Sequence, residues 1–354
     1  MILRSQSLQF GSGPEGVTTI SPREPIALES LVGILADNRA ELMNVLQKSG
    51  VVLFRGFSVT DPVLFGSVLR EGFGLDLWNS YNSRRMPDFL ARKIRKYGES
   101  FVGGSDYRQY LGQDAVQLGP VDNGVQGPHV EGGIAPDRAR FLGLMCVEPA
   151  PHLAETGFAD LVKVYSELST EAKNKYKAAS NRFSYVVKRD IRWYDHVICT
   201  LGKYKIVQEK GKPVKLVLPP CPLVCTIPET GELTIQPWAF SRNTVDQVQR
   251  SAQASYPGRL EIDRDSTASQ VHLMWELSDA LGEKLDWMED EQIELFTRIY
   301  SNSKLMTWQR GDFALVDNMR MAHWRMNGVQ GNRKLVQIQA NAFNANHYAV
   351  KSAN

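Results

Sequence analysis

The chain has 354 residues, of which 43% are hydrophobic and 23% charged, a composition typical of a globular protein and unlike that of a disordered one. Its 41 Lys and Arg nearly balance 39 Asp and Glu, so the net charge of +2 does not indicate a nucleic-acid partner. No apolar run approaches the roughly 18 residues of a membrane span, no signal-peptide core opens the chain, and four cysteines do not make a disulfide scaffold, so a cytoplasmic location without a membrane partner is predicted.

The N-terminal part is predicted to mix helices and strands. Apolar residues recur near helical spacing over 27–48, which indicates an amphipathic helix. The apolar run Val51–Phe54 lies between two glycines and suits a buried strand. Asp61 followed by Pro62 is typical of an N-cap with proline at the first helical position, and Gly72 lies near the end of that helix.

From about residue 140 onward the pattern becomes mostly β. Residues 141–147 form an apolar run with β propensity, and residues 335–343 alternate strictly between apolar and polar side chains. Helical spacing interrupts the strands over 267–282 and again over 288–300, where acidic residues come first. Strands with a helical insertion, preceded by an αβ portion, predict a decorated β-barrel or a double-sheet jelly roll.

The stretch GPHVEGG places a histidine and a carboxylate two residues apart, at His129 and Glu131. Gly127, Pro128 and Gly132 argue against a helix here, and on an extended segment side chains two apart point to the same face. An imidazole and a carboxylate that converge are suitable ligands for a divalent metal, although an isolated HxE is more often a surface turn.

A second group of polar residues follows nearly two hundred residues later. Gly311-Asp312 leads into an apolar strand, Asp317-Asn318 follows it, and a second strand carries His323. Arg333 comes ten residues after His323, at the start of the alternating strand. A short turn between adjacent strands of a jelly roll would bring such a pair side by side.

Taken together, these segments resemble the TauD/TfdA-type (clavaminate synthase-like) branch of the Fe(II)/2-oxoglutarate-dependent dioxygenases. That family has an RGF segment, an HxD or HxE, a GGET-like segment and a GD…DN…H…R block, in this order. The corresponding segments here are Phe54-Arg55-Gly56-Phe57, His129-Val130-Glu131, Ala154-Glu155-Thr156, and Gly311-Asp312 through Arg333. They span most of the chain.

The resemblance implies a mainly β fold with flanking helices, built on a double-stranded β-helix (jelly roll, cupin-like) core. We expect one catalytic domain over residues 1–354, with an N-terminal αβ portion over about 1–120. The jelly-roll core would then cover about 121–354, with a helical insert at about 265–302.

The resemblance also implies the roles of individual residues. His129, Glu131 and His323 would form a facial triad of metal ligands and the catalytic centre, which suits Fe(II) and leaves positions open for 2-oxoglutarate and O2. Arg333 matches the family arginine that holds the distal carboxylate of 2-oxoglutarate, and Thr156 matches a threonine that donates to the same carboxylate.

The chain departs from the family pattern in two places. The GGET segment reads Ala-Glu-Thr here, so the loop that enters Thr156 is altered. The acidic ligand is Glu131 in place of the commoner aspartate, as in the clavaminate synthase-like members. A carboxylate at this position argues against the halogenating relatives, in which a small residue leaves the coordination site to chloride.

Four other candidates stay open between a functional and a structural role. Arg325 lies two residues after His323 and could hold a substrate carboxylate or form an ion pair. Arg192, in a cluster of basic and aromatic residues, could line a substrate mouth. Asp317-Asn318 could orient His323, but an Asx-type turn is favoured. The segment Gly103–Arg108 could form a lid.

The sequence therefore predicts an oxygenase that uses Fe(II), 2-oxoglutarate and O2 to oxidise a C–H bond of a small polar, amino-acid-derived molecule, by hydroxylation, cyclisation or desaturation, with release of succinate. An amino acid bound to a carrier protein is an alternative substrate. A non-catalytic jelly-roll metal-binding protein and a zinc hydrolase are alternatives of other classes; the hydrolase would leave the spacing of Arg333 unexplained. The sequence does not indicate an oligomeric state.

Overall fold

The structure of this protein is a computed structural model that describes residues 7–13, 16–79, 87–102, 109–112, 115–118, 124–201, 203–259 and 273–350. Structural statements below refer to these residues. The predicted lid segment Gly103–Arg108 lies outside them.

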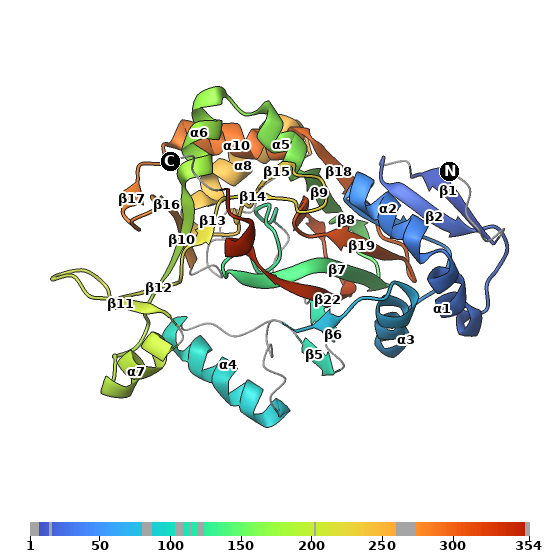
Figure 1. The fold of residues 1–354 in the computed structure, drawn as a ribbon, viewed down its shortest axis with the longest axis horizontal. Coiled ribbons are helices and arrows are strands. Elements are labelled where there is room, and N and C mark those ends of the chain that lie inside the picture. The colour runs from blue at the N-terminus through green and yellow to red at the C-terminus, as the bar shows by residue number, and fades with distance from the viewer. Residues whose placement is uncertain are drawn as a thin grey trace.

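A nine-stranded sheet combines strands from the N-terminal and C-terminal parts of the chain (Figure 1). Its strands follow the order β1-β2-β3-β19-β7-β22-β6-β5, with β4 on the side of β22. The strands are β1 (Leu8–Ser12), β2 (Thr18–Pro22), β3 (Val51–Phe54), β4 (Leu77–Trp78), β5 (Gln109–Gly112), β6 (Ala115–Leu118), β7 (Asp137–Glu148), β19 (Phe313–Asp317) and β22 (Lys334–Asn344). The strands predicted at 51–54, 141–147 and 335–343 are confirmed. The N-terminal αβ portion thus contributes strands to the same sheet as the C-terminal part.

Short strands form a second layer against this sheet. The three-stranded sheet β18-β9-β20 consists of Ser303–Met306, Thr156–Asp160 and Met321–Arg325. Beside it lie the pairs β14-β15 (Val224–Thr226 with Leu233–Ile235) and β21-β8 (Gly328–Val329 with His152–Leu153). Phe158 of β9 and Met306 of β18 are fully buried against Leu142 of β7 and Val316 of β19. The two layers therefore face each other across one apolar core, as in the predicted jelly roll.

Helices cover the outer face of the large sheet. They are α1 (Leu28–Asp37), α2 (Arg39–Ser49), α3 (Pro62–Ser67) and a π-helical turn at Val68–Gly72. The predicted helix over 27–48 is two helices, because Asn38 leaves helical geometry and its side chain donates to the carbonyl of Ile34. Asp61 caps α3 as predicted, accepting from the backbone N–H groups of Val63 and Leu64.

A second group of helices packs on the smaller sheets. It contains α5 (Leu161–Glu167), α6 (Thr170–Ala178), α8 (Val245–Ser255), α10 (Glu289–Ser301) and 3-10 turns at Arg242–Thr244 and Ala345–Tyr348. The helix predicted over 288–300 is confirmed as α10, which has three acidic residues in its first turn.

The helix predicted over 267–282 is wrong for the residues that the structure describes. Leu273–Ser278 is strand β16, so the insert expected at about 265–302 contains strands before its helix. Leu273, Trp275 and Leu277 are buried on one side and alternate with Met274 and Glu276, which is the period of two of a strand. β16 belongs to the sheet β11-β12-β10-β16-β17, and β13 also pairs with β10. These strands are β10 (Ser180–Val186), β11 (Lys205–Val207), β12 (Lys215–Val217), β13 (Cys221–Pro222) and β17 (Lys284–Leu285).

An arm projects from one edge of this sheet (Figure 1). It consists of α4 (Asp88–Val102), α7 (Trp193–Leu201) and the strands β11 and β12. Phe101 of α4, Cys199 of α7 and Leu216 of β12 share a small buried cluster that holds these elements together. No helix among the described residues is long and apolar enough to cross a membrane.

The RGF and GD segments meet in space. The guanidinium of Arg55, at the end of β3, donates to both oxygens of Asp312 at the start of β19, with the shortest contact at 2.8 Å. Asp312 is 1% exposed and also accepts from the backbone N–H of Gln309. Gly311 has φ +82°, and a Cβ there would lie 2.6 Å from the Cα of Ser58. These contacts therefore fasten β3 to β19.

We predict that Arg55→Met lowers the free energy of unfolding by about 3 kcal/mol, because it leaves the Asp312 carboxylate buried without its cation. The matched control is Arg310→Met, which removes an ion pair with Glu148 whose arginine side chain is 67% exposed and should cost less than about 1 kcal/mol. Denaturant unfolding of both variants measures the difference. Equal losses would contradict the role given to Arg55.

Candidate metal centre

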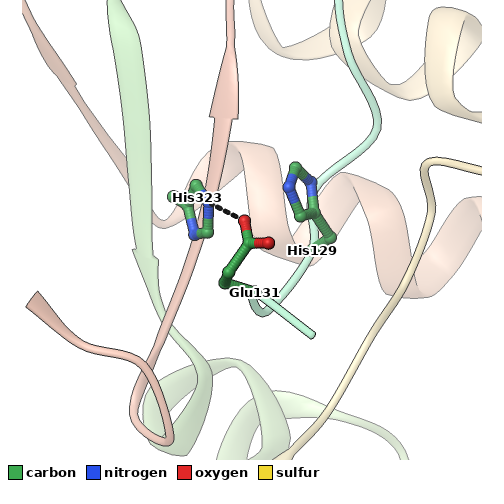
Figure 2. A group of neighbouring side chains, drawn as sticks. All are labelled: His129, Glu131 and His323. Atoms are coloured by element: carbon green, nitrogen blue, oxygen red, sulfur yellow. Dashed lines mark ion pairs between the residues drawn. The ribbon is translucent and has the colours of Figure 1, made fainter. Parts of the chain in front are cut away.

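Three side chains from two distant parts of the chain converge (Figure 2). His129 and Glu131 lie on the segment that precedes β7, and His323 lies on β20. One ligand atom of each residue lies within 4.8 Å of the others. Nε2 of His323 is 3.8 Å from Oε2 of Glu131, and the two imidazole centroids are 4.6 Å apart. The predicted ligands are thus brought together.

Backbone pairing sets this meeting. The N–H of His129 donates to the carbonyl of His323 over 3.1 Å, and the N–H of His323 donates back to the carbonyl of His129 over 2.9 Å. This reciprocal pair is a one-residue antiparallel bridge, which places the two side chains next to each other. The segment then leaves the strand, because a turn begins at Glu131 and Gly132 has φ +70°.

The imidazole of His129 is oriented by its own segment. Its Nδ1 lies 2.8 Å from the carbonyl oxygen of Gly127, a contact that places the proton on Nδ1 and leaves Nε2 as the nitrogen that could bind a metal. Gly127 is required for close packing, since a Cβ there would lie 2.0 Å from the carbonyl oxygen of Ala239. Trp238 borders the imidazole with a ring-centroid distance of 5.0 Å.

Asn318 holds the backbone of Glu131. Its Oδ1 accepts from the N–H of Glu131 over 2.7 Å, and its Nδ2 donates to the carbonyl of Glu131 over 3.0 Å. The same Nδ2 also donates to the carbonyl of Ala139 over 2.8 Å. The Asx-type turn favoured from the sequence is present at Asp317, whose Oδ1 accepts from the N–H groups of Met319 and Arg320. Asn318 acts on Glu131, not on His323.

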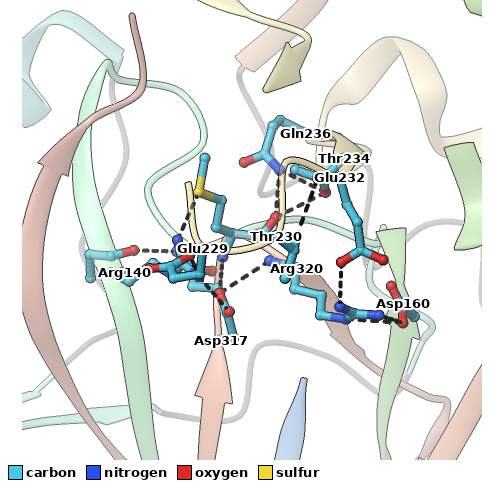
Figure 3. Close-up of polar contacts among 12 residues, drawn as sticks. Arg140, Asp160, Glu229, Thr230, Glu232, Thr234, Gln236, Asp317 and Arg320 are labelled. Atoms are coloured by element: carbon cyan, nitrogen blue, oxygen red, sulfur yellow. Dashed lines mark hydrogen bonds and ion pairs between the residues drawn. The ribbon is translucent and has the colours of Figure 1, made fainter. Parts of the chain in front are cut away.

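A buried polar network fixes this turn (Figure 3). Burial raises the pKa of Asp317, and the adjacent Arg140, 2.7 Å away, opposes that shift. Arg320 bridges Asp160 and Glu232 at 2.7 and 3.0 Å. The carbonyl of Met319 accepts from the side chains of Thr234 and Gln236. The turn that carries Asn318 and begins β20 is therefore held from several sides.

Arg333 is a buried cation without a counter-charge among the described residues. It is 8% exposed, its Nε has no hydrogen-bond partner, and it lies just before β22. Burial, and secondly the positive charge of Arg325, lower the pKa of Arg333 to about 10, so the group is still a cation at neutral pH. Two neighbouring guanidinium groups in a buried site favour an anionic ligand.

Thr156 lies opposite Arg325 in the register of β9 and β20. Its hydroxyl oxygen accepts from the indole N–H of Trp308 over 2.7 Å, which leaves the hydroxyl proton to donate elsewhere. The altered loop before it contains two residues with positive φ, Leu153 at 55° and Ala154 at 57°. Thr156 nevertheless enters β9 beside the strand that carries His323.

Comparisons with known proteins agree with this geometry. The family described as "Taurine catabolism dioxygenase TauD, TfdA family" matches residues 13–339 of the chain. The chain belongs to this family. Its enzymes use Fe(II), 2-oxoglutarate and O2. A comparison with curated proteins gives no significant match.

Solved structures share the TauD fold at low sequence identity. One is PvcB, an Fe, alpha-ketoglutarate dependent oxygenase from an isonitrile synthetic pathway, with a TM-score of 0.53, 11% identity, and coverage of 98% of this chain and 97% of that one. Another is a putative alpha-ketoglutarate-dependent taurine dioxygenase from Burkholderia xenovorans, with a TM-score of 0.53, 13% identity, and coverage of 98% and 99%. PvcB from Pseudomonas aeruginosa aligns with a TM-score of 0.50, 12% identity, and coverage of 96% and 93%.

The residues of this TauD-family chain fit an iron centre. The group of possible ligands among the described residues contains two imidazoles and one carboxylate, a donor set suited to Fe(II). No further His, Cys, Asp or Glu of the described part of the chain joins this group. Coordination positions would therefore stay open for a bidentate co-substrate and O2.

The other two predicted substrate residues differ in their placement. Arg325 is 4% exposed and its Nη2 donates to the carbonyl of Gly124 over 2.7 Å, within the same buried region as Arg333. Arg192 lies just before α7, on the arm, and its guanidinium contacts Tyr194. Its backbone N–H donates to Asp195, so the contacts shown for Arg192 among the described residues stay within the arm.

The burial of two polar residues of β22 was not predicted from the sequence. Gln337 and Gln339 of β22 read as the polar, outward side of an alternating strand, yet they are 2% and 4% exposed. They share a side of β22 with Leu335, which packs in the core between the two layers. Neither amide atom of Gln337 has a partner among the described residues, so it is a polar group available to a ligand. The strict alternation was present in the sequence, but it does not tell which two layers a strand separates.

We predict that Asn318→Ala weakens the affinity for divalent metal by about 10- to 100-fold, because it frees the backbone that positions Glu131. Titration with Mn(II) or Co(II) measures the change. Asn302→Ala is the control, since that amide also donates to a backbone carbonyl but lies at the end of α10. Unchanged metal affinity in Asn318→Ala would refute the positioning role.

Proposed function

We propose that this chain is an Fe(II)/2-oxoglutarate-dependent dioxygenase that oxidises a C–H bond of a small polar, amino-acid-derived molecule and converts 2-oxoglutarate to succinate. The observation that carries the proposal is the convergence of His129, Glu131 and His323 in a chain whose Arg333 is buried without a counter-charge among the residues that the structure describes. The family membership supports the class of reaction.

His129, Glu131 and His323 would hold the iron. When bound, iron would supply the redox chemistry that activates O2, with 2-oxoglutarate consumed as the co-substrate. The protein contributes orientation: Gly127 fixes the tautomer of His129, and Asn318 fixes the peptide of Glu131. Glu131 occupies the position that halogenating relatives leave to chloride, so its presence supports oxygenation.

Arg333 and Thr156 would hold the distal carboxylate of 2-oxoglutarate. A guanidinium offers two parallel N–H donors to a carboxylate, and the hydroxyl of Thr156 has a proton to donate. Trp308 holds the oxygen of Thr156 from the other side, which fixes the direction of that donor. A bound carboxylate would also neutralise the cation that burial destabilises.

Arg325 supports an acidic or amino-acid-like substrate. It follows His323 by two residues on β20, so both side chains leave the same face of the strand. With Arg333 engaged by 2-oxoglutarate, a second guanidinium would be placed for a carboxylate of the substrate. Hydroxylation, cyclisation and desaturation all fit this arrangement, and so does an amino acid carried on another protein.

We predict that His129→Ala and Glu131→Ala each abolish succinate formation in the presence of Fe(II), 2-oxoglutarate, O2 and a substrate found by screening amino acids and related metabolites. His196→Ala is the matched control, because this histidine is exposed on α7, and it should keep the parent rate. Full turnover by either ligand variant would overturn the assignment of the triad.

We predict that Arg333→Gln raises the KM for 2-oxoglutarate by about 30-fold or more, since a charge-assisted bidentate contact becomes a neutral one. Arg325→Gln should instead raise the KM for the substrate and change that for 2-oxoglutarate by less than about threefold. Succinate release measured against each concentration separates the two. The reverse pattern would exchange the roles of Arg333 and Arg325. If neither variant changed either KM, both proposed roles would be contradicted.

A further inference from the structure

The arm carries an unusual concentration of positive charge. Residues 87–102 and 187–217, which make up its helices and strands, contain twelve Lys and Arg against five Asp and Glu, a net of +7 in a chain whose total is +2. Most of these cations are exposed. The exposed ones include Arg92, Lys93, Lys96, Lys188, Arg192, Lys203, Lys205, Lys210 and Lys212.

The same arm exposes large apolar side chains. On α7, Trp193, Val197 and Leu201 are spaced four residues apart and therefore form one stripe, with 80%, 53% and 78% of their surface exposed. On α4, Phe89 and Ile94 are 61% and 50% exposed. Several large apolar residues gathered on one projecting element are typical of a surface that another surface covers.

The arm is held in place from within, so this exposure follows from its packing. Asp195 is completely buried in α7 and pairs with Arg189 over 2.6 Å. Its other oxygen accepts from the hydroxyl of Tyr97 on α4. Arg189 lowers the pKa of Asp195 well below its usual range, so the carboxylate stays ionised and joins the two helices. This pairing gives Arg189 a structural role within the arm.

An acidic surface lies at the other edge of the same sheet. Residues 276–294, which form the end of β16, β17 and the first six residues of α10, contain eight Asp and Glu and one Lys, a net of −7. Three of the acidic residues, Glu276, Glu289 and Glu291, form ion pairs within the chain. We call this segment the acidic edge.

The acidic edge also exposes apolar side chains. Leu281 is 87% exposed and Met288 is 64% exposed, in the midst of the carboxylates. Glu283, Asp286 and Asp290 are exposed around them. The arm and the acidic edge therefore match in two respects: their segments carry net charges of opposite sign, and both combine charge with exposed apolar side chains.

The two surfaces belong to opposite ends of one sheet. Its strand order is β11-β12-β10-β16-β17, with the arm at β11 and the acidic edge at β17. Within one chain the intervening strands keep them apart. If two copies were related by a two-fold axis, each arm could contact the acidic edge of the other copy, and the interface would close with two identical contacts.

We propose that the arm is a docking surface for a second copy of this chain, and that its site on that copy is the acidic edge. A basic and apolar surface could in general also bind an anionic membrane. The second copy is favoured because a surface of opposite charge with exposed apolar residues is present on the chain itself. The proposal does not depend on the proposed function.

The test is sedimentation of the full-length protein over a range of concentrations and salt. The parent protein should be a dimer that dissociates more readily at high salt, since complementary charges contribute to its association. Trp193→Ser combined with Leu201→Ser should raise the dimer dissociation constant by about 30-fold or more, as expected when central apolar residues are lost. Val63→Ser, at an apolar residue of α3 that is 52% exposed, is the control and should leave it unchanged.

A charge exchange makes the test specific for this pair of surfaces. Lys203→Glu with Lys205→Glu on the arm should give a monomer, and so should Asp286→Lys with Asp290→Lys on the acidic edge. A mixture of the two variants should restore a heterodimer. The altered arm of one variant then meets the altered acidic edge of the other with both charges reversed, while the second contact joins an unaltered arm to an unaltered edge. A parent protein that is monomeric throughout, a dimer that survives both charge reversals, or a mixture that stays monomeric would overturn the proposal. In the first case, binding of the monomer to anionic but not neutral vesicles would assign the arm to a lipid surface.

Discussion

The candidate site depends on one short antiparallel contact, the reciprocal pair of backbone hydrogen bonds between His129 and His323. This contact brings together two segments nearly two hundred residues apart. Because it is made by backbone groups, it places the two imidazoles next to each other independently of side-chain interactions. Asn318 positions Glu131, the third proposed ligand, through hydrogen bonds to its backbone N–H and carbonyl. The centre is therefore positioned mainly by backbone, and the charged turn around Asp317 keeps that backbone in place.

The second constraint is electrostatic. Arg333 is buried and positively charged, and the neighbouring Arg325 repels it. A protein with such a buried cation is stabilised when an anion binds beside it. The TauD/TfdA family membership and the donor set of the triad make 2-oxoglutarate the anion that fits this account.

Much of the fold could be predicted from the sequence, because its long strands and capped helices are marked locally. The apolar run at Val51–Phe54 and the Asp61 cap have this character. The helix expected over 267–282 was wrong, because it was predicted from apolar residues such as Met274, Trp275 and Leu281, whereas the buried side chains of this segment follow a period of two and the segment pairs with strand β10. The three proposed metal ligands were predicted from motif order, and the structure brings their side chains together. The contact of Asn318 with Glu131 and the burial of Gln337 did not, because both depend on which strands face each other.

The central claim is that His129, Glu131 and His323 form an open iron site that binds 2-oxoglutarate through two further coordination positions. The most direct measurement is the visible absorption spectrum of the protein after anaerobic addition of Fe(II) and then 2-oxoglutarate. The account predicts a metal-to-ligand charge-transfer band that appears only with both additions and is absent from Glu131→Ala. A parent protein that binds Fe(II) yet shows no band with 2-oxoglutarate would contradict it.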